Sequence, residues 1–260
     1  MPGPVFPYNE KPMKPVLLRS ISIAACLIPI LTNAQVFQVG AWNTLEGKLG
    51  NSDMQMALYL FRDGSLKGNY ILKYTGTKTQ LAGTQIGKAV TLKEVIKNTP
   101  WGTFKGTVGD SADKFSGSWT DSGATQMLAF NLRLLASNLT SYEMRYPGLF
   151  GTQEDIEQFV KKAVAAILIN DKDWLGDHIR FPLRHIAGKG FNGIADKQAM
   201  IRHYDEIFTR QFKDKIRQAY TTNLFTRNSE VMLGTGEIWF GNVSGSTKDK
   251  YSYQIVSVNP

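Results

Sequence analysis

The acidic stretch DKDWLGDH, which begins at Asp171, holds the residue types best suited to chemistry in this chain. Asp171, Asp173 and Asp177 are spaced somewhat like the oxygen ligands of a calcium-binding loop. However, Leu175 stands at one of the ligand positions, and Pro182 stands where such a loop needs a glutamate. We therefore expect no calcium site, and we interpret the stretch as a helix end followed by a loop.

Histidine offers a second kind of chemistry. His178 follows Asp177, and the two are candidate catalytic residues because histidine titrates near neutral pH. An ordinary hydrogen-bonded pair is the more frequent role of such neighbours. His178, His185 and His203 lack the spacing of metal-binding motifs, and the chain has one cysteine. The sequence thus predicts no metal site and no cofactor.

The stretch LGTGEIWFGN near the C-terminus places a carboxylate and a tryptophan in an apolar strand. Side chains alternate between the faces of a strand, so Glu237 and Trp239 share one face while Ile238 and Phe240 share the other. If Glu237 and Trp239 face inward, they line a ligand pocket. If they face outward, they suit a protein interface. Burial in a core without further function is the most frequent role of such a strand.

The first half of the chain has the period of β-strands. From Val39 to about Leu135 apolar and polar residues alternate, and Asp63-Gly64 predicts a hairpin turn. The expected strands include residues 54–61, 66–74, 80–86, 88–92, 103–108, 114–119 and 127–132.

A glycine pattern recurs along these strands. It reads apolar-x-Gly in LKGNY, LAGTQ, FKGTV and FSGSW, which begin at residues 66, 81, 104 and 115. Glycine inside a strand marks a bend or a close approach of two backbones. Repeated once per strand, it predicts a strongly curved antiparallel β-meander, as a barrel or half-barrel. A barrel of this kind can hold a ligand, although curvature alone explains the glycines.

The second half has a different period. Residues 138–151 have no sustained pattern and contain Pro147-Gly148, so we place a linker there, after a β-meander domain over residues 35–137. Thr152 and Asp155 form a capping box that predicts a helix. A further helical region spans residues 200–220, and strands follow it. This order predicts an α+β domain over residues 152–260.

Several segments of this second domain, taken in order, are similar to those of a known superfamily. The segments ILINDKDWLGDHIRFPLR, IRHYDEIFTRQFKDKI, NLF and VMLGTGEIWFGN together resemble the nuclear transport factor 2-like (NTF2-like) superfamily, in its bacterial secreted branch. The resemblance implies helices on a strongly bent antiparallel sheet, in a cone with an internal pocket. Superfamily members include isomerases, dehydratases and binding or immunity modules, so the fold does not determine the function. The binding residues expected to line the cone or its rim are Trp174, His178, Arg180, Tyr204, Glu237 and Trp239.

The N-terminal residues 1–34 have the pattern of a signal peptide. Basic residues precede the apolar run from Ile21 to Leu31, and the small-residue site at Ala34 follows. The run is shorter than the roughly 20 residues of a membrane span. Cleavage after Ala34 is favoured over lipidation of Cys26, and Met13 is an alternative start. A mature chain without cysteine fits a periplasmic or secreted bacterial protein.

The charge of the chain gives weaker guidance on its partners. The 260 residues carry a formal net charge of +8 that is dispersed along the sequence, whereas nucleic-acid binders concentrate basic residues. We therefore predict an exported, non-enzymatic binding protein of the cell envelope, which recognises a small ligand or a protein in the manner of an inhibitor or immunity module. The alternative is an isomerase, dehydratase or hydrolase that uses His178 with Asp177 or Glu237. A homodimer through the outer face of the NTF2-like sheet is a further expectation.

Overall fold

The computed structural model describes Met1, Gly3 and residues 37–96, 99–111, 113–187 and 190–260. The chain divides into two units, Met1–Asn33 and Ala34–Pro260. Apart from Met1 and Gly3, the predicted signal peptide, Cys26 included, lies outside the described residues and stays a prediction. The fold set out below is that of the Ala34–Pro260 unit.

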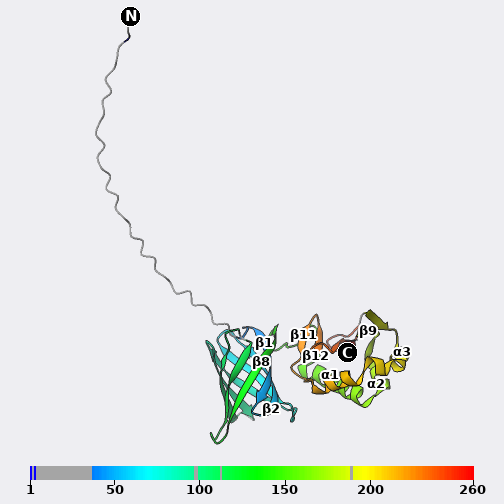
Figure 1. The fold of residues 1–260 in the computed structure, drawn as a ribbon, viewed down its shortest axis with the longest axis horizontal. Helices are drawn as coiled ribbons and strands as arrows, with labels where there is room; N and C mark the ends of the chain where they lie inside the picture. The colour runs from blue at the N-terminus through cyan, green and yellow to red at the C-terminus, as the bar shows by residue number, and fades with distance from the viewer. Residues whose placement is uncertain (2, 4–36, 97–98, 112, 188–189) are drawn as a thin grey trace. The chain divides into compact units, whose positions relative to one another are not determined.

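The first half of this unit is a closed eight-stranded barrel (Figure 1). Neighbours in sequence pair antiparallel throughout, and β1 closes the barrel by pairing with β8. The predicted meander is therefore confirmed, in the form of a complete barrel. Its strands are β1 (Ala41–Leu49), β2 (Ser52–Leu60), β3 (Ser65–Leu72), β4 (Lys78–Ile86), β5 (Ala89–Ile96), β6 (Thr99–Val108), β7 (Lys114–Asp121) and β8 (Met127–Leu139).

The glycines of the apolar-x-Gly pattern lie where neighbouring strands approach closely. A Cβ atom added to Gly68 would overlap the carbonyl oxygen of Ala57 on β2. One added to Gly83 would overlap the carbonyl oxygen of Thr91 on β5. The other two glycines of the pattern face a neighbouring backbone in the same way. The interpretation of these glycines as points of close approach is confirmed.

The barrel interior is filled by apolar and aromatic side chains around a buried glutamate. The rings of Phe115 and Phe130 pack edge to face with their centroids 4.7 Å apart. Glu94 is 1% exposed, and its Oε1 accepts hydrogen bonds from the Tyr70 hydroxyl and from Trp119 Nε1, both at 2.7 Å. Both donors thus have a buried acceptor, which a buried polar group requires.

The second half contains a six-stranded sheet in the order β10-β9-β14-β13-β12-β11. Its pairs are antiparallel except β14 with β9, which is parallel. The expectation of a wholly antiparallel sheet is therefore wrong at this pair. A parallel pair needs a long connection, and the helices and strands between β9 and β14 supply one. The strands are β9 (Ile179–Ala187), β10 (Gly190–Ile194), β11 (Phe225–Arg227), β12 (Glu230–Leu233), β13 (Ile238–Asn242) and β14 (Tyr253–Val258).

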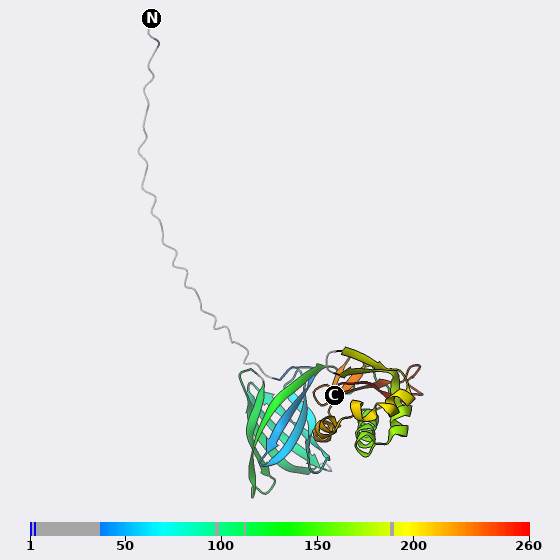
Figure 2. The same ribbon diagram turned by 45° about the vertical axis from the view of Figure 1, so that its right-hand side comes forward.

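Helices gather on one side of this sheet (Figure 2). The first begins with the predicted capping box, since the Thr152 side chain accepts from Asp155 N and the Asp155 carboxylate accepts from Thr152 N. The predicted region 200–220 is divided into shorter helices, because Thr209 starts a new one by accepting from Phe212 N. The helices are α1 (Gln153–Ile169), α2 (Lys172–His178), α3 (Lys197–Arg202), α4 (Tyr204–Ile207) and α5 (Arg210–Gln218).

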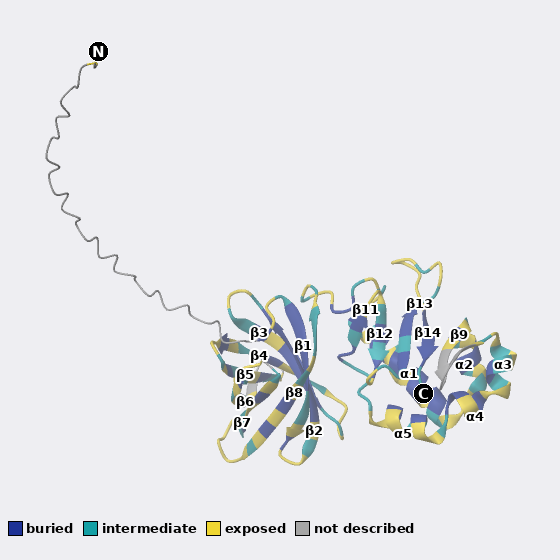
Figure 3. Cartoon of the chain, turned by 45° about the horizontal axis from the view of Figure 1, so that its top comes forward, coloured by how far each residue is buried: buried dark blue, intermediate teal, exposed yellow. Residues whose placement is uncertain are grey.

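The strand that carries Trp239 buries its aliphatic face. Ile238 and Phe240 are fully buried and pack in the core between the sheet and the helices. Trp239 is half-buried on the opposite face of β13, and Glu237 lies in the turn before the strand. Figure 3 shows β13 and β14 buried along most of their length. Of the three roles weighed for this stretch, core packing is the one that Ile238 and Phe240 adopt.

The mixed α+β fold that the order of elements predicted is confirmed, while the NTF2-like cone stays a prediction. Within the described part of the chain, every helix is too short or too polar to cross a bilayer.

Hydrogen bonds join the barrel to the second half of the unit. Lys78 Nζ on β4 donates to Glu157 Oε2 on α1 at 2.5 Å. Asn138 Nδ2 on β8 donates to the carbonyl oxygen of Thr226 on β11 at 2.9 Å. Glu157 is only 5% exposed, and its Oε1 also accepts from the Tyr146 hydroxyl at 2.8 Å. The two halves are thus connected by buried polar contacts.

Candidate functional site

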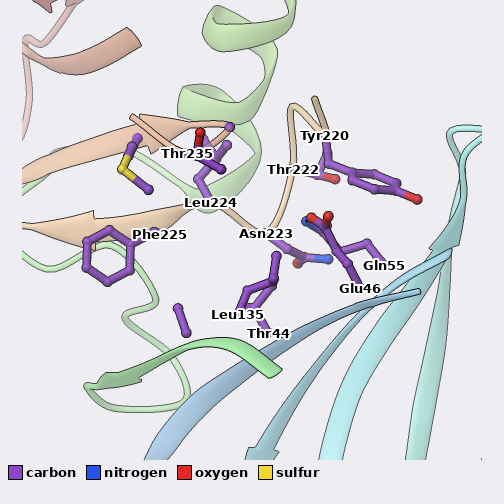
Figure 4. Close-up of a pocket in the computed structure, with 13 residues that line it drawn as sticks. Thr44, Glu46, Gln55, Leu135, Tyr220, Thr222, Asn223, Leu224, Phe225 and Thr235 are labelled. Carbon is purple, nitrogen blue, oxygen red and sulfur yellow. The ribbon is translucent and has the colours of Figure 1, made fainter. Parts of the chain in front are cut away.

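A cavity of about 400 Å³ lies where the barrel meets the second half of the unit (Figure 4). Strands β1, β2 and β8 form one side of it. The segment between α5 and β11, together with β12 and the turn after it, forms the other side. We call it the junction cavity, and its lining residues are Thr44, Glu46, Gln55, Leu135, Ala136, Tyr220, Thr222, Asn223, Leu224, Phe225, Met232, Gly234 and Thr235.

Glu46 and Gln55 form the polar part of the barrel side. They are direct partners across β1 and β2, and Gln55 Nε2 donates to Glu46 Oε1 at 3.0 Å. This bond fixes the orientation of the amide, because the reverse orientation would place two oxygen atoms together. Gln55 Oε1 is consequently buried without a hydrogen-bond partner among the described residues.

Asn223 brings a second acceptor from the other side. Its backbone has a φ of +50°, in the left-handed region that asparagine tolerates better than most residues. Its backbone N donates to Glu157 Oε1 at 2.9 Å, and its Nδ2 donates to Asn69 Oδ1 at 2.8 Å. The remaining atom, Asn223 Oδ1, is buried and has no donor in the described part of the chain. Figure 4 shows Glu46, Gln55 and Asn223 gathered beside the cavity.

The electrostatics of the junction cavity depend on Glu46 and on Lys73 near it. Burial raises the pKa of Glu46, while the Gln55 hydrogen bond and the charge of Lys73 act against this rise. Burial also lowers the pKa of Lys73, against the attraction of Glu46 and Asp53. Lys73 Nζ donates to the carbonyl oxygen of Gln218 at 2.6 Å. Its donors thus point to backbone oxygens, and the acceptors in the cavity remain free to accept hydrogen bonds from a ligand.

Tyr220 completes the polar rim. Lys73 Nζ lies over its ring, 4.5 Å from the centroid. Burial raises the pKa of the Tyr220 hydroxyl, which lacks a hydrogen-bond partner among the residues described.

The rest of the lining is apolar. Leu224 is 4% exposed, and Phe225 and Met232 face each other across β11 and β12. Leaving a buried acceptor without a donor costs about 1–3 kcal/mol. A ligand that brings N–H donors to Gln55 and Asn223 recovers this cost, and its apolar part finds an apolar wall. Such a mixture is the usual make-up of a small-molecule site.

The predicted catalytic pair is not a hydrogen-bonded pair. His178 Nδ1 lies 2.7 Å from the carbonyl oxygen of Trp174, and the two rings stack 3.9 Å apart. The Asp177 carboxylate instead accepts from Lys197 Nζ at 2.7 Å, and this bond lowers the pKa of Asp177. The stretch DKDWLGDH, which we interpreted as a helix end and loop, is helix α2. Asp171 starts it by accepting from Trp174 N at 3.0 Å.

None of the other predicted binding residues is a lining residue of the junction cavity, although Glu237 contacts Thr235, which is one. Tyr204 is 1% exposed and donates from its hydroxyl to the carbonyl oxygen of Ile167 at 2.9 Å, so it belongs to the core. Arg180 Nη2 lies 3.7 Å from Glu230 Oε1. Glu237 accepts from Thr235 N at 2.6 Å in its own turn. These residues do not form one site.

Trp239 is not a lining residue of the junction cavity either. It lines a hollow of about 410 Å³ together with Arg184 and Glu230, on the face of β13 away from the core. Its ring meets that of Phe225 edge to face at 6.4 Å. The expected homodimer through this outer face stays a prediction. The side chain of His185, the third histidine considered, lies outside the described residues.

Little in the sequence indicated the junction cavity. Gln55 and Glu46 occupy polar positions in alternating strands, where a polar side chain usually meets water. Asn223 follows two threonines in an irregular segment, so it looks like an ordinary loop residue. Only the tertiary fold brings these side chains together and buries their acceptor atoms.

Comparison with known proteins gives a single weak likeness to report. No protein-family model matches the chain, and no curated protein matches it. The chain is similar to a solved structure of the amine binding protein of Rhodnius prolixus in complex with tryptamine, with 13% sequence identity and a TM-score of 0.26. The likeness covers 50% of this chain and 73% of the other. At this TM-score it supports no conclusion on function.

Proposed function

We propose that this protein binds a small ligand in the junction cavity without transforming it. The ligand presents an N–H donor group, an amine or an amide, to Glu46, Gln55 and Asn223. Its apolar part packs against the side of the cavity that contains Leu224 and Phe225. Export of the protein to the bacterial cell envelope and an NTF2-like second domain belong to this proposal. The signal-peptide pattern supports the first, and the helices on one side of the six-stranded sheet support the second.

The observation that carries the proposal is the pair of buried acceptors, Gln55 Oε1 and Asn223 Oδ1. They come from opposite sides of the same cavity, and each has its N–H groups directed elsewhere. The Glu46 carboxylate beside them adds a third acceptor. Three acceptors with few donors favour a ligand head group that donates hydrogen bonds over one that accepts them.

The test compares three probes with the same six-carbon body. We would titrate the full chain with hexylamine, hexanamide and hexanol by calorimetry. Hexylamine or hexanamide is expected to bind more tightly than hexanol, because the ammonium and the amide each donate at least two hydrogen bonds, one for each buried acceptor, whereas the alcohol donates only one. Equal binding of hexanol would contradict the proposal.

Substitution at the cavity has a matched control within the barrel. Gln55→Met keeps the length of the side chain and removes the acceptor, so binding of the amine or amide should weaken by up to about tenfold. Gln85 is also a buried glutamine whose Oε1 has no partner in the described part of the chain, but it is not among the lining residues of the junction cavity. Gln85→Met should leave binding unchanged. Equal effects of the two substitutions would count against the site.

A further inference from the structure

Arg145, in the segment between β8 and α1, is a buried cation whose donors are only partly used. It is 3% exposed. Its Nη2 donates to Thr44 Oγ1 at 2.9 Å, and its Cζ lies 4.5 Å from the centroid of the Trp42 ring. Nε and Nη1 are buried and have no hydrogen-bond partner among the described residues. No carboxylate of the described residues forms a salt bridge with Arg145.

Such a guanidinium is costly to bury. Arginine stays protonated in proteins, so it cannot avoid the cost by losing its charge. Removal of a cation from water is offset only where counter-charges and acceptors replace the water. Contacts with the Trp42 and Tyr146 rings, one bond to Thr44 and the charge of Glu157 replace only part of it. Glu157, a nearby buried carboxylate, already accepts from Lys78 and Tyr146. The unused donors therefore call for an acceptor that the described side chains do not supply.

A cavity of about 750 Å³ adjoins Arg145 and provides the space. It is lined by the segment from Ser141 to the first turn of α1 and by Lys248 from the loop after β13. Glu143 and Glu154 also line it. The charged residues around the cavity are thus two bases and two exposed acids. A doubly charged anion would be repelled by both acids, whereas a single negative charge next to Arg145 meets less repulsion.

We propose that this cavity, the Arg145 cavity, binds the carboxylate group of a small organic molecule, which accepts from the free donors of the Arg145 guanidinium. The Arg145 cavity and the junction cavity share no lining residue, although Thr44 of the junction cavity accepts from Arg145. The Arg145 cavity selects the opposite chemistry, an acceptor group in place of a donor group. The planar guanidinium offers parallel pairs of donors along its Nε–Nη2 and Nη1–Nη2 edges, which suit a planar carboxylate. The Trp42 ring, 4.5 Å away, restricts its orientation. The proposal does not depend on ligand binding in the junction cavity.

The test uses sodium butyrate as the probe and the full chain as the protein. Trp42 lies against the guanidinium, so the tryptophan fluorescence of the protein, to which Trp42 and four other tryptophans contribute, is expected to change as butyrate binds, and the change should saturate. The thermal midpoint should rise with butyrate concentration, since a ligand of the folded state stabilises it. Sodium chloride at the same ionic strength should produce neither effect. Identical curves for butyrate and chloride would overturn the proposal.

Substitutions then locate the site. Arg145→Lys keeps the charge and loses the fork of donors, so butyrate should bind about tenfold more weakly or worse. Arg202→Lys, at an exposed position on α3, is the matched control and should bind like the unaltered chain. Equal affinity of the Arg145→Lys protein would overturn the assignment to Arg145. If that variant does not fold, the comparison of butyrate with chloride on the unaltered chain decides. Tighter binding of inorganic phosphate than of butyrate would overturn the choice of a carboxylate.

Discussion

Glu94 in the barrel and Gln55 at the junction are both buried polar side chains, but their hydrogen bonding differs. Glu94 accepts from two donors that are themselves buried, Tyr70 and Trp119. Gln55 donates to Glu46 and leaves its Oε1 without a donor in the described part of the chain. The cluster around Glu94 therefore has its donors matched to an acceptor, while Gln55 and Asn223 in the junction cavity each have an acceptor without a donor among the described residues.

This difference separates a structural role from a binding role. A matched polar cluster contributes to stability and to a single arrangement of the core. Spare buried acceptors lower stability, so those that belong to the lining of a cavity, as in Gln55 and Asn223, are expected to accept from a ligand. Substitutions in the two regions distinguish these roles by the size of their effect on stability.

Substitution of Glu94 should have the largest effect. Glu94→Ala would leave the Tyr70 hydroxyl and Trp119 Nε1 buried without an acceptor, so the free energy of unfolding should fall by about 3 kcal/mol. Urea unfolding followed by circular dichroism measures this change. Glu94→Gln, which keeps one acceptor oxygen, should cost less. A loss from Glu94→Ala no larger than that of an exposed glutamate would show that the cluster is not structural.

Two tyrosines with buried hydroxyl groups should respond differently when these groups are removed. Tyr204 donates to the carbonyl oxygen of Ile167, so Tyr204→Phe should lower the free energy of unfolding by about 1 kcal/mol. The Tyr220 hydroxyl is buried without a partner among the described residues, so Tyr220→Phe should leave stability unchanged or raise it slightly. The same urea experiment measures both. A loss for Tyr220→Phe equal to that for Tyr204→Phe would mean that the Tyr220 hydroxyl has an acceptor after all.

The smallest effect concerns the pH dependence of stability. Burial raises the pKa of Glu46 above its ordinary value of 4.5. A carboxyl group with a raised pKa in the folded state contributes stability that is complete below its unfolded pKa and is lost as pH rises through its folded pKa. Glu46→Gln removes this dependence, so stability should fall less between pH 4.5 and neutral pH than it does in the unaltered chain.

Unfolding in urea at a series of pH values measures this difference. Asp249→Asn, in an exposed loop, is the control and should leave the pH dependence unchanged. A pH dependence in the Glu46→Gln protein as steep as that of the unaltered chain would show that Glu46 is not the group responsible.

Local patterns in the sequence were sufficient for part of the fold. The capping box at Thr152 involves residues three apart, and the glycine pattern reports on backbone contacts within one strand pair, so both could be predicted. The helix that begins at Asp171 was missed because its acidic residues and Gly176 looked like a loop. The structure shows that Asp171 is the cap of this helix.

The candidate site depended on information that the sequence does not contain. Alternation along a strand divides residues into two faces but does not say which face is buried. Ile238 and Phe240 lie in the core, and Glu237 lies in the turn before the strand. Gln55 and Asn223 meet only because the barrel and the second half are in contact, and no periodicity within either segment reports on that contact.

The buried contacts of Glu157 also determine how this protein can be divided. The predicted linker between the two halves looks like a place where the chain could be cut to yield two independent domains. However, Glu157 on α1 depends on Lys78 of the barrel, and Asn223 depends on Asn69 of the barrel. Separation would expose these groups or leave them unpaired, so neither half is expected to be a stable fragment. Heating should accordingly unfold the barrel and the second half in one calorimetric transition, although each half has its own hydrophobic core.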